Sequence, residues 1–134
     1  MIPNLERATS KAEMILQKHG IACPMQILKK IPGVLVASYA ETSESVGIDR
    51  ENLMTMFGDH DQDAVTTVKI ENGKTVYLVV YNRTLTCKET RFALARELGH
   101  IVLGHDGSRP EAVRNEEAIC FANRLLEGME GDAL

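Results

Sequence analysis

The 134-residue sequence lacks the features that mark several protein classes. It has no apolar run approaching the ~18 residues that a membrane-spanning helix needs, and its first residues, MIPNLER, include no apolar segment typical of a signal peptide. Its three cysteines, Cys23, Cys87 and Cys120, are odd in number and have no paired spacing. We therefore expect reduced thiols in a cytoplasmic protein, with neither a disulfide framework nor a cysteine-rich zinc site, and no membrane partner.

The sequence also lacks an excess of positive charge. Its 19 acidic and 15 basic residues give a formal net charge of −4, and no basic stripe is present, so we expect no direct nucleic-acid partner. Hydrophobic residues make up 44% and charged residues 25%, as in soluble globular proteins. With no repeat and no linker, residues 1–134 are predicted to form one domain whose tail, about 128–134, is frayed.

Several segments are predicted to be helical. Asn4 can cap a first helix that Gly20 ends, Pro24 suits the first turn of a second helix, and Asp49 can cap a third that ends near Gly58. The spacing of apolar residues predicts two longer helices near the end of the chain, at about 88–105 and about 110–127.

Three β-prone runs lie between these helices, at 34–39, 64–70 and 75–81. Asn72-Gly73 separates the last two runs and predicts a β-hairpin, because both residues tolerate positive φ. The run 75–81 is apolar on both faces, which favours a strand covered on each side. The order of elements indicates an α+β fold with a small antiparallel sheet.

The stretch FALARELGH, residues 92–100, differs at one position from the helical zinc motif H-E-x-x-H. On a helix, Arg96, Glu97 and His100 share an arc of about 100°, and most of the remaining circumference is apolar. Such a narrow polar arc is expected to line a cleft. The alternative is that Arg96 and Glu97 extend into water while His100 lies in the core.

Two stretches resemble the motifs of a known family. The run RFALARELGHIVLGH (91–105) is similar to the first motif of the ImmA/IrrE family of zincin-like metallopeptidases, and NEEAICFANRLL (115–126) is similar to its second. The resemblance implies a zincin-like fold in which the near-motif helix packs against the C-terminal helix. In that family two histidines and a glutamate bind zinc, and the motif glutamate is the general base.

Carried over by position, the resemblance makes His100 the one retained zinc ligand and Glu97 the general base. Arg96 takes the place of the first histidine, and Asn115 that of the ligand glutamate. A guanidinium has no lone pair to offer a metal, and an amide is a weak ligand for zinc. We therefore expect no cofactor and a vestigial role for Glu97.

The positions of residues 115–117 around the last predicted helix indicate which of them could face inward as the third zinc ligand. Asn115 falls near the middle of the apolar stripe, which predicts that it faces inward, whereas Glu116 and Glu117 lie on the two flanks. His105 is expected at the end of the preceding helix, roughly opposite Arg96.

Three functions follow from these patterns. The leading hypothesis is a non-catalytic binding or regulatory module, a pseudoenzyme whose partner is a protein such as a repressor of a phage or mobile element, or another DNA-binding protein. The alternative is an active zinc endopeptidase that cleaves a transcriptional repressor and uses His100 with Glu116 or Glu117. The third is a purely structural or oligomerising domain.

Overall fold

The structure, a computed structural model, describes residues 1–20, 23–46, 63–82, 86–105 and 108–132. The chain divides into two compact units: a first unit of 1–27 and 95–134, and a second unit of 28–94. None of the helices in the described ranges is long and apolar enough to cross a membrane. The helix expected between Asp49 and Gly58 lies outside the described residues.

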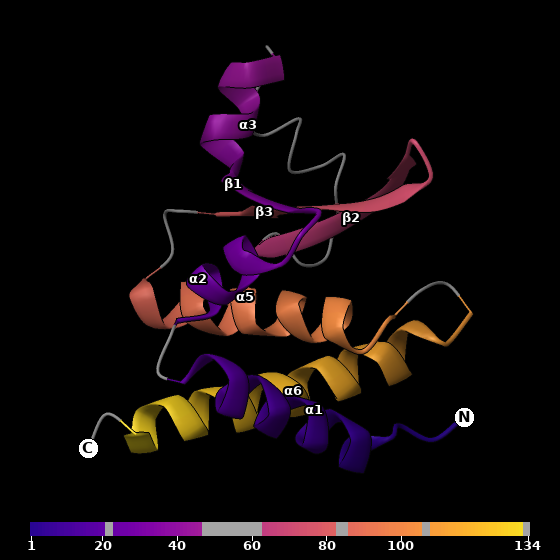
Figure 1. Cartoon of the computed structure of the whole chain (residues 1–134), viewed down its shortest axis with the longest axis vertical. Helices are drawn as coiled ribbons and strands as arrows, with labels where there is room; N and C mark the ends of the chain where they lie inside the picture. Colours follow the sequence, from indigo (N-terminus) through magenta and orange to yellow (C-terminus); the bar gives the residue numbers. More distant parts are fainter. Residues whose placement is uncertain (21–22, 47–62, 83–85, 106–107, 133–134) are drawn as a thin grey trace. The chain divides into compact units, whose positions relative to one another are not determined.

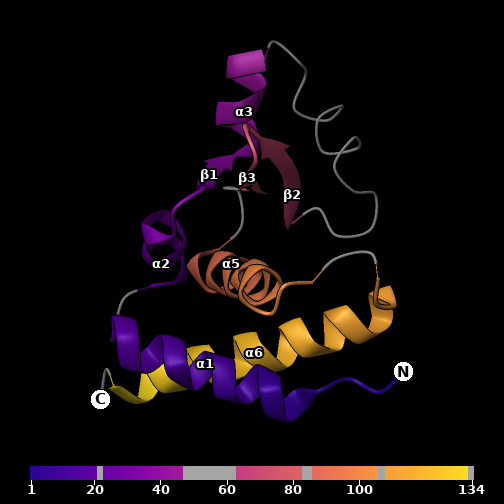
Figure 2. The same cartoon turned by 45° about the vertical axis from the view of Figure 1, so that its right-hand side comes forward.

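The first unit is built around two long helices. α1 (Leu5–His19) and α6 (Glu111–Asp132) lie side by side and run in the same direction, as both views of the ribbon show (Figures 1 and 2). α1 begins where expected, because the Asn4 side chain accepts a hydrogen bond from the Arg7 N–H at 3.0 Å. It also ends where expected, at Gly20, which has a φ of 66°.

α6 continues to Asp132, beyond the expected end near residue 127, because its last turns still pack against α1. Met129 is buried. A Cβ placed on Gly128 would overlap the Leu16 side chain, so the two helices approach closely at this glycine. This contact explains why residues 128–132 are helical, whereas the sequence pattern predicts fraying from about 128.

α5 (Cys87–Val102) carries the near-motif and is shorter than the helix predicted at about 88–105. It packs against α6 where Gly99 faces the Phe121 ring, at a distance that leaves no room for a Cβ. The helix ends before Gly104, which has a φ of 66°, and the chain then turns back. His105 is therefore outside the helix.

The second unit contains a three-stranded sheet in the order β1-β3-β2, formed by β1 (Val34–Ser38), β2 (Ala64–Glu71) and β3 (Lys74–Tyr81). β2 and β3 form the predicted hairpin, and Asn72 and Gly73 both have positive φ.

β3 is the central strand, as its two apolar faces suggest, and the adjacent residues Val79 and Val80 are both fully buried. β1 pairs with β3 in parallel, so the sheet is mixed and the prediction of an antiparallel sheet is wrong. The hairpin turn sets only the relative direction of β2 and β3. The direction of β1 depends on a long connection that has no comparable local signal.

The helix α3 (Tyr39–Val46) follows β1 without a break and was not predicted. Ser38 and Glu41 cap its start reciprocally: the Glu41 N–H donates to Ser38 Oγ at 3.1 Å, and the Ser38 N–H donates to Glu41 Oε1 at 3.3 Å. Tyr39 was expected to end the strand and instead begins this helix. The S-x-x-E spacing at 38–41 is the sequence signal that would have indicated it.

Candidate functional site

The near-motif residues all lie on the part of α5 that belongs to the first unit. Arg96 and His100 are one helical turn apart and half-buried. Glu97 is buried, with 5% of its surface exposed, and it makes contacts of its own. The structure thus places Arg96 and His100 as neighbours on one face of α5, as the sequence predicts.

The predicted orientation of Asn115 on α6 is wrong. Asn115 is exposed, as is Glu116, whereas Glu117 is one of the most deeply buried residues of the chain. The error arose from Ile119, an apolar residue that helical periodicity assigns to the inner face of α6 but that is 39% exposed. Including it rotated the expected inner face of the helix toward Asn115 and away from Glu117.

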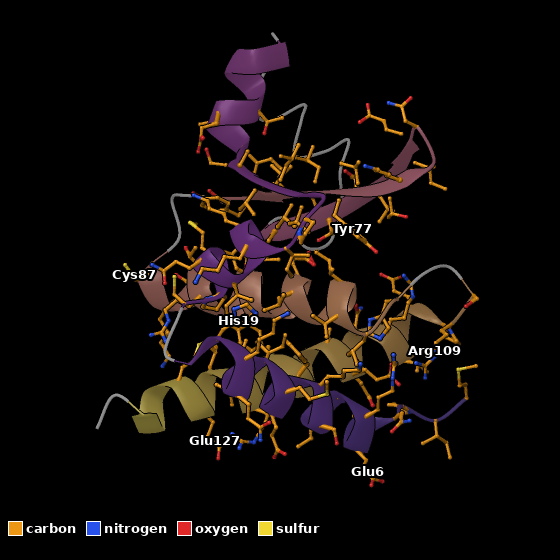
Figure 3. All side chains as sticks on the ribbon, in the orientation of Figure 1. Glu6, His19, Tyr77, Cys87, Arg109 and Glu127 are labelled. Atoms are coloured by element: carbon orange, nitrogen blue, oxygen red, sulfur yellow. The ribbon has the colours of Figure 1, made fainter. Side chains whose placement is uncertain are left out.

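Glu117 can be buried because four hydrogen bonds reach its carboxylate. Arg109 forms a bidentate pair with it, with both nitrogen–oxygen distances at 2.7 Å. The Asn4 N–H donates to Oε2 at 2.6 Å, and His105 Nε2 donates to Oε1 at 2.8 Å. Figure 3 shows Arg109 in the segment that leads into α6.

His105 is the functional residue that the sequence reasoning placed wrongly. After the turn at Gly104, its N–H donates to the His100 carbonyl oxygen at 3.0 Å, and its side chain is 2% exposed. Its Nδ1 lies 2.8 Å from Nδ1 of His100, while its Nε2 contacts Glu117. His105 therefore joins the near-motif helix to the buried carboxylate, instead of lying opposite Arg96. We refer to Asn4, His100, His105, Arg109 and Glu117 as the Glu117 network.

The Glu117 network was missed because its members are far apart in sequence. Asn4 and Glu117 are separated by 113 positions. The local signals were the histidine of the second LGH, at 103–105, and a glutamate on the flank of an apolar stripe. Neither signal identifies its partner.

The network keeps Glu117 ionised. Burial alone would raise the pKa of this carboxyl, but the hydrogen bonds from Asn4, His105 and Arg109, together with the Arg109 charge, hold the pKa below its ordinary value of 4.5. A carboxylate in this state can only accept hydrogen bonds, so its partners must all be donors.

Both histidines have pKa values shifted in the opposite sense to that usual for a histidine beside a carboxylate. Burial, with additional lowering from His105, Arg96 and Arg114, brings the pKa of His100 to about 4. Burial and the charges of Arg109 and Arg114 lower the pKa of His105 and outweigh the raising effect of Glu117. At neutral pH both rings are therefore uncharged.

These residues do not fit a zinc ion as they stand. Arg96 cannot ligate a metal, Asn115 is exposed, and both oxygens of Glu117 are already used by Arg109. Among the residues that the structure describes, no group of three or more His, Cys, Asp or Glu side chains is arranged to hold a metal ion.

No protein family, curated protein or solved structure matches the chain. The structure establishes an α+β architecture with a small mixed sheet. The finer assignment to the zincin-like fold is a proposal that rests on the two sequence motifs.

Proposed function

We propose that the chain has a zincin-like fold of the ImmA/IrrE kind with a degenerate zinc site, and that it is a non-catalytic binding module for a protein partner. The two sequence motifs, 91–105 and 115–126, support the fold. The functional proposal rests on the hydrogen bonding of the Glu117 carboxylate. This carboxylate, which His105 links to His100, is saturated by Arg109 and two further donors.

The charges around His100 support the same conclusion. Arg96 stands at the position of the first histidine, and the guanidinium groups of Arg96 and Arg114 both lower the pKa of His100. The positive potential that disfavours a proton on this ring also disfavours a divalent cation. Glu97 has no metal-bound water to activate in such a site, and its proposed role is structural.

The partner follows from the resemblance alone. Active ImmA/IrrE peptidases act on repressor proteins of phages, conjugative elements or stress regulons, so we propose a repressor or another DNA-binding protein as the bound partner. The net charge of −4 argues against direct binding of nucleic acid.

One observation favours the second candidate, an active zinc endopeptidase with an irregular ligand set. His100 and Glu117 both contact the His105 ring, which brings two imidazoles and a carboxylate into one cluster. A zinc ion would have to displace Arg109 from Glu117 in order to use that carboxylate. We therefore rank this candidate second.

Zinc content separates the two candidates. The protein is dialysed against zinc, then against buffer, and its metal is measured by elemental analysis. We expect well below one zinc per chain. Stoichiometric zinc that is lost in His100→Gln would contradict the pseudoenzyme proposal and support the endopeptidase.

A gain-of-metal test examines the proposed fold. Arg96→His restores imidazoles at i and i+4, and Arg109→Gln releases the carboxylate of Glu117, the buried glutamate of α6, because the exposed Asn115 cannot supply the third ligand. We expect neither single variant to bind zinc tightly and the double variant to do so. A double variant that binds no better than the native chain would contradict the zincin-like assignment.

The partner is tested in the native cell. Cross-linking followed by mass spectrometry is expected to recover a repressor or another DNA-binding protein intact, with no cleavage fragment. Recovery of self-linked copies alone would favour the oligomerising-domain hypothesis.

A further inference from the structure

β2 is an edge strand of the sheet in the second unit, because β3 lies on one side of it and, in the described part of the chain, no strand lies on the other (Figure 1). The Asn82 N–H donates to the Asp63 carbonyl oxygen at 2.9 Å, so these two residues form a hydrogen-bonded pair of the antiparallel ladder. Hydrogen-bonded and non-hydrogen-bonded pairs alternate along such a ladder. Thr66, Val68 and Ile70, at odd distances from Asp63, therefore direct their N–H and C=O groups away from β3.

These outward backbone groups are unpaired. Within the described ranges, none of Thr66, Val68 and Ile70 makes a backbone hydrogen bond outside the β2–β3 ladder, and the buried Thr66 Oγ1 has no partner either. The side chains of Val68 and Ile70 are 56% and 75% exposed, although both are apolar and β-branched. An edge strand with unpaired backbone groups and exposed apolar side chains is a template for another strand.

The other edge of the sheet is less suited to strand addition. β1 has five residues against eight in β2, and α3 begins directly after its last residue. Leu35, at 62%, is the exposed large apolar residue of β1. Because short edge strands are a common protection against pairing between chains, an added strand is expected at β2.

A second copy of β2 matches this edge. In an antiparallel pair around a two-fold axis at Val68, Val68 lies opposite its own counterpart, and Thr66 lies opposite Ile70 of the second copy. Each outward N–H then faces an outward C=O, and β-branched side chains pair across the two strands. Pairing about a two-fold axis also closes on itself, whereas pairing of β2 with β1 of another copy would continue into a filament. We propose that the chain forms a two-fold dimer through β2, in which the two sheets become one.

The size of the contact sets the expected strength of this dimer. Stable dimers bury at least about 1,200 Å² in total, and one pair of short strands with two exposed apolar side chains on each covers less. We therefore expect a weak, reversible dimer with a Kd between about 10 µM and about 1 mM. The contact lies in the second unit, so it depends neither on the proposed loss of zinc in the first unit nor on the zincin-like fold.

The first test uses the native chain over a range of concentrations. Sedimentation velocity from about 5 µM to about 1 mM should show the monomer giving way to a dimer. In the same samples, the amides of Thr66, Val68 and Ile70 should exchange at least about threefold more slowly at the highest concentration than at the lowest. The Thr67 amide, which donates to β3, should exchange at one rate throughout.

Two results of this test would overturn the proposal. One is a monomer at every concentration. The other is a dimer in which the three outward amides exchange equally fast at low and high concentration, because the second copy would then cover another surface. Species larger than a dimer would overturn the two-fold geometry, since β2 would then pair with β1.

Variants locate the contact, and circular dichroism confirms that each is folded. Val68→Pro removes one outward N–H but no hydrogen bond to β3, so it should weaken dimerisation at least about tenfold. Ile70→Lys places a charge on the β2 edge without a change to the backbone and should do the same. The matched control is Leu35→Lys, the same kind of change on β1, which should leave dimerisation unchanged. A folded Ile70→Lys that dimerises like the native chain would overturn the proposal.

The dimer and the proposed protein partner can fail separately. The β2 dimer predicts self-linked copies in the cross-linking experiment, whereas the function proposed above predicts a linked repressor or another DNA-binding protein. Ile70→Lys should remove the self-linked copies and leave the linked partner in place. Loss of the partner alone would contradict the proposed function and leave the dimer supported.

Discussion

The buried side chains of the second unit are almost all apolar, whereas the first unit buries two glutamates. Among the described residues of the second unit, the buried polar residue is Ser38, which caps a helix that begins beside it. In the first unit, Glu117 is stabilised by donors from Asn4, His105 and Arg109. Loss of an apolar contact lowers the free energy of unfolding roughly in proportion to the apolar area that is lost. Removal of one member of a buried ion pair costs more, because the remaining charge stays buried without a partner. The first unit should therefore be much more sensitive to single substitutions at its buried polar residues.

The largest effect is expected from Glu117→Ala. It leaves Arg109, which is 24% exposed, and His105 without their acceptor, and we expect the free energy of unfolding to fall by about 3–5 kcal/mol. Urea denaturation measures this change. The matched control is Glu116→Ala, because Glu116 is the exposed neighbour; it should change stability by about 0.5 kcal/mol or less. Similar effects for the two variants would mean that the Glu117 network does not stabilise the first unit.

The second prediction concerns the pH dependence of the free energy of unfolding, to which the buried histidines of the first unit contribute. The pKa of His100 is lowered from 6.5 to about 4, so the unfolded chain takes up this proton at a higher pH than the folded chain does. The contribution of neutral His100 to the free energy of unfolding is complete above pH 6.5, the ordinary pKa of histidine, and is lost as the pH falls toward 4. The total loss is about 3 kcal/mol at most. The lowered pKa of His105 acts in the same direction.

Urea denaturation of the native chain and of His100→Gln across this pH range tests the prediction. The variant, which has no titrating group at position 100, should lose less stability on acidification. Parallel curves would show that His100 is not the titrating group. The lowered pKa of Glu117 adds a further loss only below its ordinary value of 4.5.

Close packing in the first unit gives the third prediction. A Cβ on Gly99 would lie 2.9 Å from the Phe121 ring, so Gly99→Ala should destabilise the fold by about 1–3 kcal/mol. Phe121→Leu makes room at this contact, and the double variant should lose less stability than the sum of the two single variants. Strict additivity would mean that α5 and α6 do not meet at this point.

The smallest effect is expected in the second unit. Gly73 has a φ of 77°, and a Cβ placed there would meet no atom within 4 Å, so Gly73→Ala costs only backbone strain of about 1–2 kcal/mol. Hydrogen exchange should show faster exchange of the amides of β2 and β3, with those of α1 and α6 unchanged. Equal acceleration in both units would show that the two units unfold as one.

The elements that were predicted correctly have local causes. α1 begins at its Asn4 cap and ends at Gly20, and the β2–β3 hairpin turns at Asn72-Gly73. Each of these signals acts over a few residues, so a single segment of sequence contains the whole cause. The capping pairs that begin α3 and α5 are of the same kind and could have been read in the same way.

The predictions that failed depended on distant partners. The inner face of α6 was misjudged because apolar periodicity treats Glu117 as a surface residue and Ile119 as a core residue. Burial of the Glu117 carboxylate is favourable because Arg109, His105 and the Asn4 N–H, which are distant from it in sequence or on another element, donate hydrogen bonds to it.

By itself, the sequence determined the α+β class, the hairpin, the first helix and the pairing of Arg96 with His100 on one helix face. These follow from capping, from positive φ at the turn and from the period of the α-helix, which neighbouring residues set among themselves. The tertiary structure decided the parallel direction of β1, the turn that returns His105 to His100, and the burial of Glu117. The energy of a buried charge depends on which donors surround it, and here those donors come from both ends of the chain.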